Sequence, residues 1–233
     1  MNRTSAPGWH AASVQGPRGV NADAVAVSPG RAVFALADGV GDSPGAAHAA
    51  RIAVAAATRS PCPEGPEAAL LAAQEAVQAD ASAGDCVLVV AVAGAHGYRV
   101  AWVGDVRAYA WDGTSLRQVT RDHTVAQYFR DHGQAPTLRM EHLVTTSVRT
   151  AGAREFGSAE VPGPAGLLLT SDGVHKTLGL ATMAELLRRP ANSAEALTAA
   201  ALAEGGSDNA TALFVECVPV VADVATVPFH VAA

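Results

Sequence analysis

Two apolar runs of this chain each end directly in an Asp-Gly pair, over residues 33–39 and 167–173. A third acidic turn opens the apolar stretch 208–215. A buried strand that ends in Asp-Gly carries its carboxylate out of the core, and the glycine lets the backbone turn sharply and come close to a ligand. We therefore expect Asp38 and Asp172, which are far apart in the sequence, to lie at the ends of buried strands.

Carboxylates gathered in this way suit a hard divalent cation. Magnesium and manganese prefer oxygen ligands and normally keep several waters. However, Asp-Gly is also a common hairpin turn, and for either dipeptide alone a plain turn is the more frequent explanation. The metal interpretation therefore needs support from other parts of the chain.

That support comes from six short motifs in a fixed order. They are Arg18-Gly19-Val20-Asn21-Ala22-Asp23, Ala37-Asp38-Gly39-Val40-Gly41, Val103-Gly104-Asp105-Val106-Arg107-Ala108-Tyr109, Thr120-Arg121-Asp122-His123-Thr124, Thr170-Ser171-Asp172-Gly173-Val174 and Gly206-Ser207-Asp208-Asn209-Ala210-Thr211. In this order and at these intervals, they resemble the metal-dependent protein phosphatases of type 2C (the PPM family) in their short bacterial form. The resemblance runs from about Ser13 to Cys217, nearly the whole chain.

The secondary-structure pattern is that of an α+β domain, with strands and helices in separate blocks. Strands are expected over 24–27, 31–37, 86–92, 98–103, 107–111, 116–119, 167–170 and 210–220. Helices are expected over 43–57, 66–81, 124–131, 183–189 and 193–203, and a loop over 132–141. The resemblance implies that these elements form a layered α-β-β-α sandwich of two antiparallel sheets flanked by helices.

One domain accounts for nearly the whole sequence. We expect a flexible N-terminus over residues 1–12, a phosphatase domain over 13–220 and a C-terminal extension over 221–233. A chain of 233 residues with 49% hydrophobic and 16% charged residues can bury a substantial core, as globular proteins do.

The resemblance also implies a site for two divalent cations, manganese or magnesium. Asp38 would bridge the two cations, with the Gly39 carbonyl on one of them and with Asp172 and Asp208 on the other. A bridging water would then attack the phosphorus directly. Arg18 would bind the substrate phosphate, because a planar guanidinium can donate to two phosphate oxygens at once. Arg18 and Asp38 are thus the implied catalytic residues.

Asp23 and Asp105 are implied to support the metal cluster, but other positions depart from the family pattern. Ala22 stands where the family usually has an acidic residue, and Val40 where animal members have a histidine proposed as general acid. Many members have an aspartate four residues beyond Asp172, which with the equivalent of Asp105 holds a third metal. This chain has Lys176 there.

The ammonium of Lys176 would repel a third cation or take its place. Alternatively, Lys176 points into solvent. Two metals are therefore expected, and the third site is doubtful.

Composition limits the classes of partner that we expect this protein to bind. A net charge of −6 argues against nucleic-acid binding, which needs basic surface. The N-terminus shows no signal peptide, and the apolar runs are shorter than the roughly 20 residues of a membrane helix. Three cysteines without metal-type spacing indicate buried thiols in a reducing compartment. We expect a cytoplasmic monomer that acts on a phosphorylated Ser/Thr protein, either a kinase or a kinase substrate.

The sequence thus predicts a manganese- or magnesium-dependent serine/threonine protein phosphatase. An alternative is a weakened or inactive phosphatase domain that acts as a phosphopeptide-binding or regulatory protein, which would fit Ala22 and Lys176. A hydrolase of small phosphate esters is a third possibility.

Overall fold

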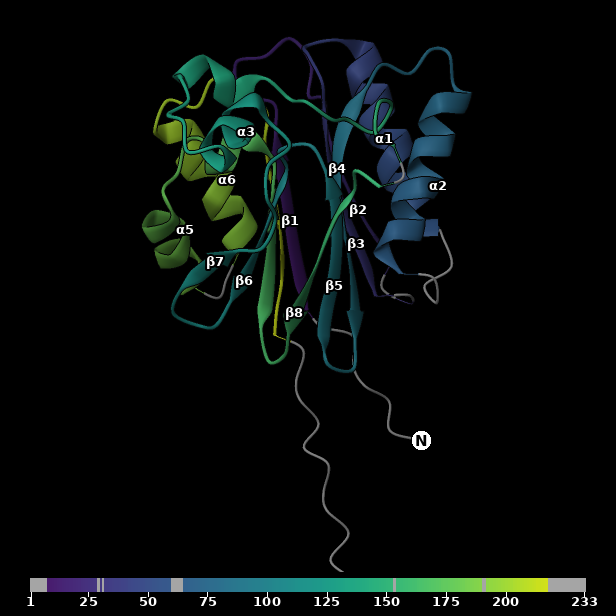
Figure 1. Ribbon diagram of the computed structural model, residues 1–233. Coiled ribbons are helices and arrows are strands. Elements are labelled where there is room, and N and C mark those ends of the chain that lie inside the picture. The colour runs from purple at the N-terminus through teal and green to yellow at the C-terminus, as the bar shows by residue number, and fades with distance from the viewer. Residues whose placement is uncertain are drawn as a thin grey trace, which may run out of the picture.

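Two five-stranded antiparallel sheets face each other in the computed structural model (Figure 1). Residues 8–28, 30, 32–59, 65–152, 154–189 and 192–217 are described. One sheet has the strand order β1-β10-β9-β6-β7, and the other has the order β2-β3-β4-β5-β8. The expected α+β sandwich is therefore confirmed.

The strands are short and mostly apolar. The first sheet contains β1 (Trp9–Val14), β10 (Ala210–Val215), β9 (Gly166–Thr170), β6 (Arg107–Trp111) and β7 (Leu116–Gln118). The second sheet contains β2 (Asp23–Ser28), β3 (Val33–Gly39), β4 (Cys86–Gly94), β5 (Gly97–Val103) and β8 (Gly157–Pro162).

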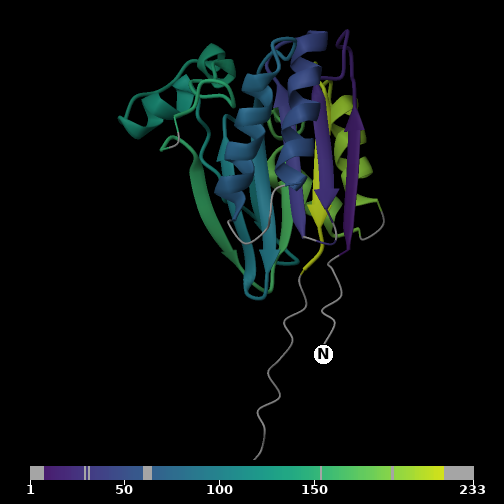
Figure 2. The ribbon, with the colours of Figure 1, turned by 90° about the vertical axis from the view of Figure 1, so that its right-hand side faces the viewer.

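Helices cover the outer face of each sheet, as Figures 1 and 2 show. Helices α1 (Pro44–Arg59) and α2 (Pro66–Ala79) pack on the second sheet, and α5 (Leu180–Leu187) and α6 (Ser193–Ala203) lie on the side of the first. The short helices α3 (Val125–Asp131), η3 (Leu138–His142) and α4 (Asp172–His175) lie in the connections.

Strand β3 shows why the layers form. Its side chains alternate, so Phe34 and Leu36 are buried between the sheets, whereas the small side chains of Ala35 and Ala37 face α1 and α2. Burying a side chain of the size of Phe34 or Leu36 contributes about 1.5–3 kcal/mol, so contacts of this kind hold the two sheets together. The alanines let α1 lie close to the sheet.

The strand ends place the acidic turns together. Asp38 lies near the end of β3, directly opposite Asp23 of β2. Strand β9 ends just before Asp172, and β10 begins just after Asp208, and these two strands are antiparallel neighbours. All these acidic residues therefore come to one end of the sandwich.

Two expectations from the sequence are wrong, one near the N-terminus and one in the middle of the chain. Trp9–Val14 forms β1, which pairs along its full length with β10, so the first sheet begins within the segment 1–12 that we expected to be flexible. The segment has no clear alternation of apolar residues, and its pairing with β10 determines its conformation. Residues 138–142 form a 3₁₀ helix rather than a loop.

Other expectations concern residues near the C-terminus and the cysteines. Strand β10 ends at Val215, and residues 218–220 and the extension 221–233 lie outside the described residues, as does Cys62. Cys86 is buried as expected, but Cys217 is exposed. Within the described residues, no helix is both long enough and apolar enough to span a bilayer.

Candidate functional site

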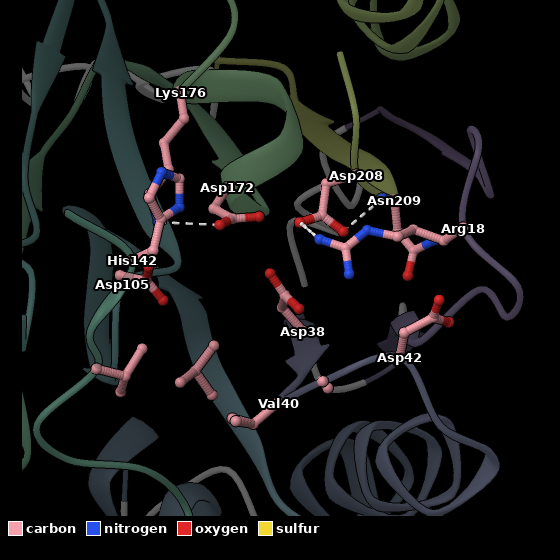
Figure 3. A pocket seen from close by; sticks show the side chains of 14 residues that line it. Arg18, Asp38, Val40, Asp42, Asp105, His142, Asp172, Lys176, Asp208 and Asn209 are labelled. Carbon is pink, nitrogen blue, oxygen red and sulfur yellow. Dashed lines mark hydrogen bonds and ion pairs between the residues drawn. The ribbon is translucent and has the colours of Figure 1, made fainter. Parts of the chain in front are cut away.

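A pocket opens at the end of the sandwich where the acidic turns meet (Figure 3). The residues that line it are Arg18, Asp38, Gly39, Val40, Gly41, Asp42, Val87, Asp105, His142, Val144, Asp172, Lys176, Asp208 and Asn209. The set includes every site residue predicted from the sequence except Asp23. Asp23 is buried beneath the pocket, where Ser171 Oγ donates to its Oδ2 at 2.7 Å.

Gly39 brings strand β3 against the start of α1. A Cβ at this position would lie 2.7 Å from both the carbonyl carbon and the oxygen of Ala46, so no larger residue fits without moving the helix. Its N–H donates to the carbonyl of Ala22 at 3.1 Å. These two contacts fix the backbone next to Asp38.

The turn that carries Asp208 lies against helix α4. Gly173 is in such close backbone contact with Asn209 that a Cβ would overlap the Asn209 carbonyl. Asp172 is the first residue of α4, so this contact places it beside Asp208. The second Asp-Gly pair is therefore needed for close packing as well as for a turn.

Arg18 reaches the acidic turn from the N-terminal side of the chain. Its Nε donates to Ser207 O at 3.0 Å, and its Nη2 donates to Asp208 Oδ2 at 2.6 Å. Its side chain is 36% exposed, so it remains accessible from the pocket.

Two residues bind the backbone of the loop that carries Arg18 (residues 18–22, the Arg18 loop). The sequence analysis gave neither of them a role. Asp42 accepts hydrogen bonds from the backbone N–H groups of Gly19 and Val20 at 3.1 and 3.0 Å. Asn209 accepts from Ala22 N at 2.8 Å and donates to Val20 O at 2.9 Å. Asn209 belongs to the last motif, but no local pattern pointed to contacts with residues so far away in the sequence.

Lys176 points into the site. Its Nζ lies 2.7 Å from Asp105 Oδ2 and 2.9 Å from Asp172 Oδ2, and its side chain is 18% exposed. The alternative of a lysine directed into solvent does not agree with this position. Its ammonium thus lies at the position where, according to the resemblance, many family members have an aspartate that holds a third metal.

The electrostatics of the site are dominated by carboxylates. Burial raises the pKa of Asp38 well above its ordinary value, and the negative charges of Asp23 and Asp172 raise it further. Burial also raises the pKa of Asp23 to about 7, against the hydrogen bonds from Thr211 and Ser171 that lower it. The site therefore carries more buried negative charge than its own cations neutralise.

The donors fit a hard divalent cation. Oδ1 of Asp23 is a buried carboxylate oxygen without a hydrogen-bond partner, and Asp38 forms no ion pair within the described part of the chain. Carboxylates and the Gly39 carbonyl are oxygen ligands of the type that magnesium and manganese prefer. As the side chains stand, no three His, Cys, Asp or Glu residues among those described are close enough to hold a metal ion. In this arrangement, Arg18 donates to a carboxylate oxygen of Asp208, and Lys176 donates to one of Asp172.

Ala22 and Val40 stand at the remaining departures from the family pattern. Ala22 is buried and packs with Ala46 and Ala47 of α1, so its side chain is part of a small apolar contact. Val40 is 49% exposed and lines the pocket. Neither residue supplies a polar group to the site.

Similarity to known proteins is found by comparing structures. No family model matches the sequence, and neither does any curated protein. The serine/threonine phosphatase PstP/Ppp of Mycobacterium tuberculosis is 26% identical, with a TM-score of 0.78, and the match covers 91% of this chain and 98% of that one. The catalytic domain of PstP in complex with two manganese ions matches at 26% identity and a TM-score of 0.73, over 91% of this chain and 98% of that one.

PppA, a key regulatory component of T6SS in Pseudomonas aeruginosa, has a similar fold. It is 24% identical, with a TM-score of 0.77, and the match covers 92% of this chain and 99% of that one. The folds agree over nearly the whole chain. The chain therefore has the fold of the PPM-type serine/threonine phosphatases.

Proposed function

We propose that the protein is a manganese- or magnesium-dependent serine/threonine protein phosphatase. The observation that carries this proposal is the convergence of Asp38, Asp172 and Asp208 on one pocket that also contains Arg18. Hydrolysis of a phosphate monoester needs charge neutralisation at the phosphate and a nucleophile near neutral pH. When bound, a pair of divalent cations supplies both, because it attracts the phosphate oxygens and lowers the pKa of water.

The protein's own residues hold and orient the reactants. Asp38, Asp172, Asp208 and the Gly39 carbonyl are the ligands that we assign to the cations. Arg18 donates to the phosphate, and the contacts of Asp42 and Asn209 keep its loop in place. Lys176 neutralises Asp105 and one oxygen of Asp172, which reduces the repulsion that an incoming phosphate dianion meets.

Removal of divalent metal is expected to abolish hydrolysis of a phosphothreonine peptide. The purified protein should release phosphate with added manganese, and excess EDTA should lower the rate by more than about 100-fold, because the proposed mechanism needs the divalent cations to lower the pKa of the attacking water. Phosphate release is measured with and without EDTA, and manganese is then restored in excess as the control for reversibility. Activity that continues unchanged in EDTA would contradict the metal-dependent mechanism.

Replacing Arg18 by Ala is expected to raise KM more than it lowers kcat. The guanidinium contacts the phosphate in the ground state as well as in the transition state, so its loss mainly weakens binding. A charge-assisted hydrogen bond contributes about 1.5–3 kcal/mol, which corresponds to a KM increase of roughly 10- to 100-fold. Steady-state kinetics on the phosphothreonine peptide give both constants.

Arg51 offers a matched control, because it is an exposed arginine on α1. Arg51→Ala should leave KM and kcat unchanged. Arg18→Lys, which keeps the charge without the planar fork, should give an intermediate KM. A large fall in kcat with unchanged KM in Arg18→Ala would instead mean that Arg18 acts only in the transition state.

The second candidate is a phosphopeptide-binding or regulatory domain without activity. Two observations favour it: Ala22 supplies no carboxylate, and Lys176 already occupies oxygens of Asp105 and Asp172. PppA, which has a similar fold, is described as a regulatory component. Binding of the phosphothreonine peptide without phosphate release at any manganese concentration would favour this candidate.

The phosphorylated Ser/Thr protein that serves as substrate, a partner kinase, a monomeric state and a cytoplasmic location stay predictions. The negative net charge of −6 suits substrates with basic residues near the phosphorylated side chain. A panel of phosphothreonine peptides that differ only in flanking charge tests this preference.

A further inference from the structure

We propose that His142 is the general acid that protonates the departing serine or threonine oxygen. This inference rests on the proposed phosphatase function and assigns a residue to a step for which the sequence motifs supply none. A serine or threonine alkoxide is a poor leaving group, so breaking its bond to phosphorus near neutral pH is faster when a proton reaches the oxygen as the bond breaks.

The position of His142 is the first argument. It is the last residue of η3 and lines the pocket together with Val144 of the same segment. Among the described residues that line this pocket, His142 is the only one with an imidazole. An imidazole is the side chain whose ordinary pKa lies nearest to neutral pH, so it can both hold and release a proton there.

The segment that carries His142 is fixed to the rest of the domain. Val125 N donates to Leu143 O at 2.9 Å, and Thr145 N donates to His123 O at 2.8 Å. Thr124 and Val144 form an isolated antiparallel bridge between these two hydrogen bonds. The backbone next to His142 is thus held against residues 123–125, which fixes where this segment meets the pocket.

The distribution of charge across the pocket is the second argument. Figure 3 shows Arg18 on one side of Asp38 and His142 on the other. A phosphoryl group held by Arg18 near the carboxylates then has the His142 side of the pocket available for its leaving oxygen. Attacking and leaving oxygens lie roughly in line through the phosphorus, so a donor on a separate wall from the phosphate-binding arginine suits the leaving group.

The charged groups around His142 are of both signs. On its own segment and on α3 these are Arg139, Glu141 and Arg130, the last of which pairs with Glu141, and across the pocket they are Asp105, Asp172 and Lys176. Charged groups of both signs thus lie on this side of the pocket.

Lys176 is the other N–H acid on this side of the pocket. Its ammonium donates to Asp105 Oδ2 at 2.7 Å and to Asp172 Oδ2 at 2.9 Å. We therefore assign Lys176 to the neutralisation of these carboxylates and not to proton delivery.

The proposed step balances as follows. A water oxygen forms the new bond to phosphorus, and the bond between phosphorus and the serine or threonine oxygen breaks with its electron pair on that oxygen. The His142 imidazolium gives its proton to the same oxygen, so the product leaves as a neutral alcohol. The neutral imidazole then regains a proton from solvent.

The test compares two substrates that differ in their need for a proton. His142→Gln keeps a polar side chain of similar reach but cannot act as an acid near neutral pH. With saturating manganese, kcat on a phosphothreonine peptide should fall about 10²- to 10⁴-fold, because general acid catalysis contributes by this factor. On p-nitrophenyl phosphate, whose leaving phenolate is stable without a proton, kcat should change by less than about threefold.

His96→Gln is the matched control, because His96 is an exposed histidine in the β4–β5 hairpin, at the end of the sheet away from the pocket. It should match the parent on both substrates. The parent's kcat on the peptide should also fall at alkaline pH, and this limb should vanish in His142→Gln.

Equal losses on both substrates, or an unchanged rate on the peptide, would overturn the assignment of His142 while leaving the phosphatase function standing. A parent protein that hydrolyses neither substrate with manganese would instead refute the phosphatase function, and the role of His142 with it.

Discussion

Replacing Asp38 by Asn is expected to lower kcat by several orders of magnitude while the fold stays intact. Asp38 lies at the centre of the pocket, between Arg18 and Asp208 on one side and Asp172 on the other (Figure 3). An amide keeps the shape but removes the negative charge and one strong oxygen ligand. Each tenfold loss in rate corresponds to about 1.4 kcal/mol, so a loss of 10³-fold or more means about 4 kcal/mol of lost transition-state stabilisation.

The same substitution is expected to stabilise the metal-free protein. Because the pKa of Asp38 is raised in the folded state, its ionised form costs folding free energy, and this cost appears as the pH rises above the ordinary aspartate pKa. Asp38→Asn should therefore raise Tm in EDTA at pH 7 and have little effect near pH 3, where the carboxyl is protonated in both states. A gain in stability together with a loss of activity is typical of a residue kept for function.

Thermal unfolding in EDTA at the two pH values, together with kcat in saturating manganese, checks both parts. Glu75→Gln on the exposed face of α2 is the control, since it makes the same chemical change away from the pocket. Retention of most of the activity by Asp38→Asn would show that the bridging role belongs to another carboxylate.

Substitution of Lys176 is expected to have the second largest effect, on both stability and metal stoichiometry. Lys176→Met leaves Asp105 and Asp172 without their cation in a largely buried place. Removing one partner of a buried ion pair typically costs about 3–5 kcal/mol, so the metal-free variant should unfold at clearly lower urea concentration. Added manganese should recover part of this loss, because a bound cation replaces the missing positive charge.

Lys176→Asp goes further, since it adds an oxygen ligand beside Asp105 and removes the repulsion between the ammonium and a cation. We expect the parent to bind two manganese ions tightly and the variant to bind a third. Calorimetric titration gives the stoichiometry without reference to activity, and the activity of the variant should rise over manganese concentrations at which the parent is already saturated.

Arg188→Met supplies the control for charge removal, because the side chain of Arg188, directly after α5, makes only exposed contacts in the described part of the chain, an ion pair with Glu185 and a hydrogen bond to the Thr114 carbonyl. Exposed pairs contribute at most about 1 kcal/mol, so this variant should unfold almost as the parent does. Three tightly bound manganese ions in the unmodified protein would refute the role that we assign to Lys176.

The strands that carry the site were predictable because their patterns are local. The runs before Asp38 and Asp172 are apolar and lead into an Asp-Gly pair, and the structure places both as expected. Strands β1 and β8 were not predicted, because their sequences contain polar residues or small side chains and their conformation depends on pairing with a neighbour. Pairing between distant segments leaves little trace in a single sequence.

The candidate site, like the fold, was predictable only where local patterns determine it. The acidic residues could be predicted from motifs, whereas the direction of the Lys176 side chain could not, because a lysine after a helical turn can face either solvent or a carboxylate. Asp42 and His142 were missed for a related reason. Their roles depend on where one loop lies against another, which no spacing along the chain reveals.

The contacts of Asn209 tie the formation of the site to the synthesis of residues 207–215. Its side chain binds backbone groups of Gln15, Val20 and Ala22, which leave the ribosome nearly two hundred residues earlier. Strand β10, which follows it, lies between β1 and β9 in the first sheet. A nascent chain whose residues 207–215 have not yet left the ribosome therefore lacks strand β10. It also lacks the contacts that hold the Arg18 loop. The site that we assign to the proposed phosphatase can therefore form only after translation has passed this point.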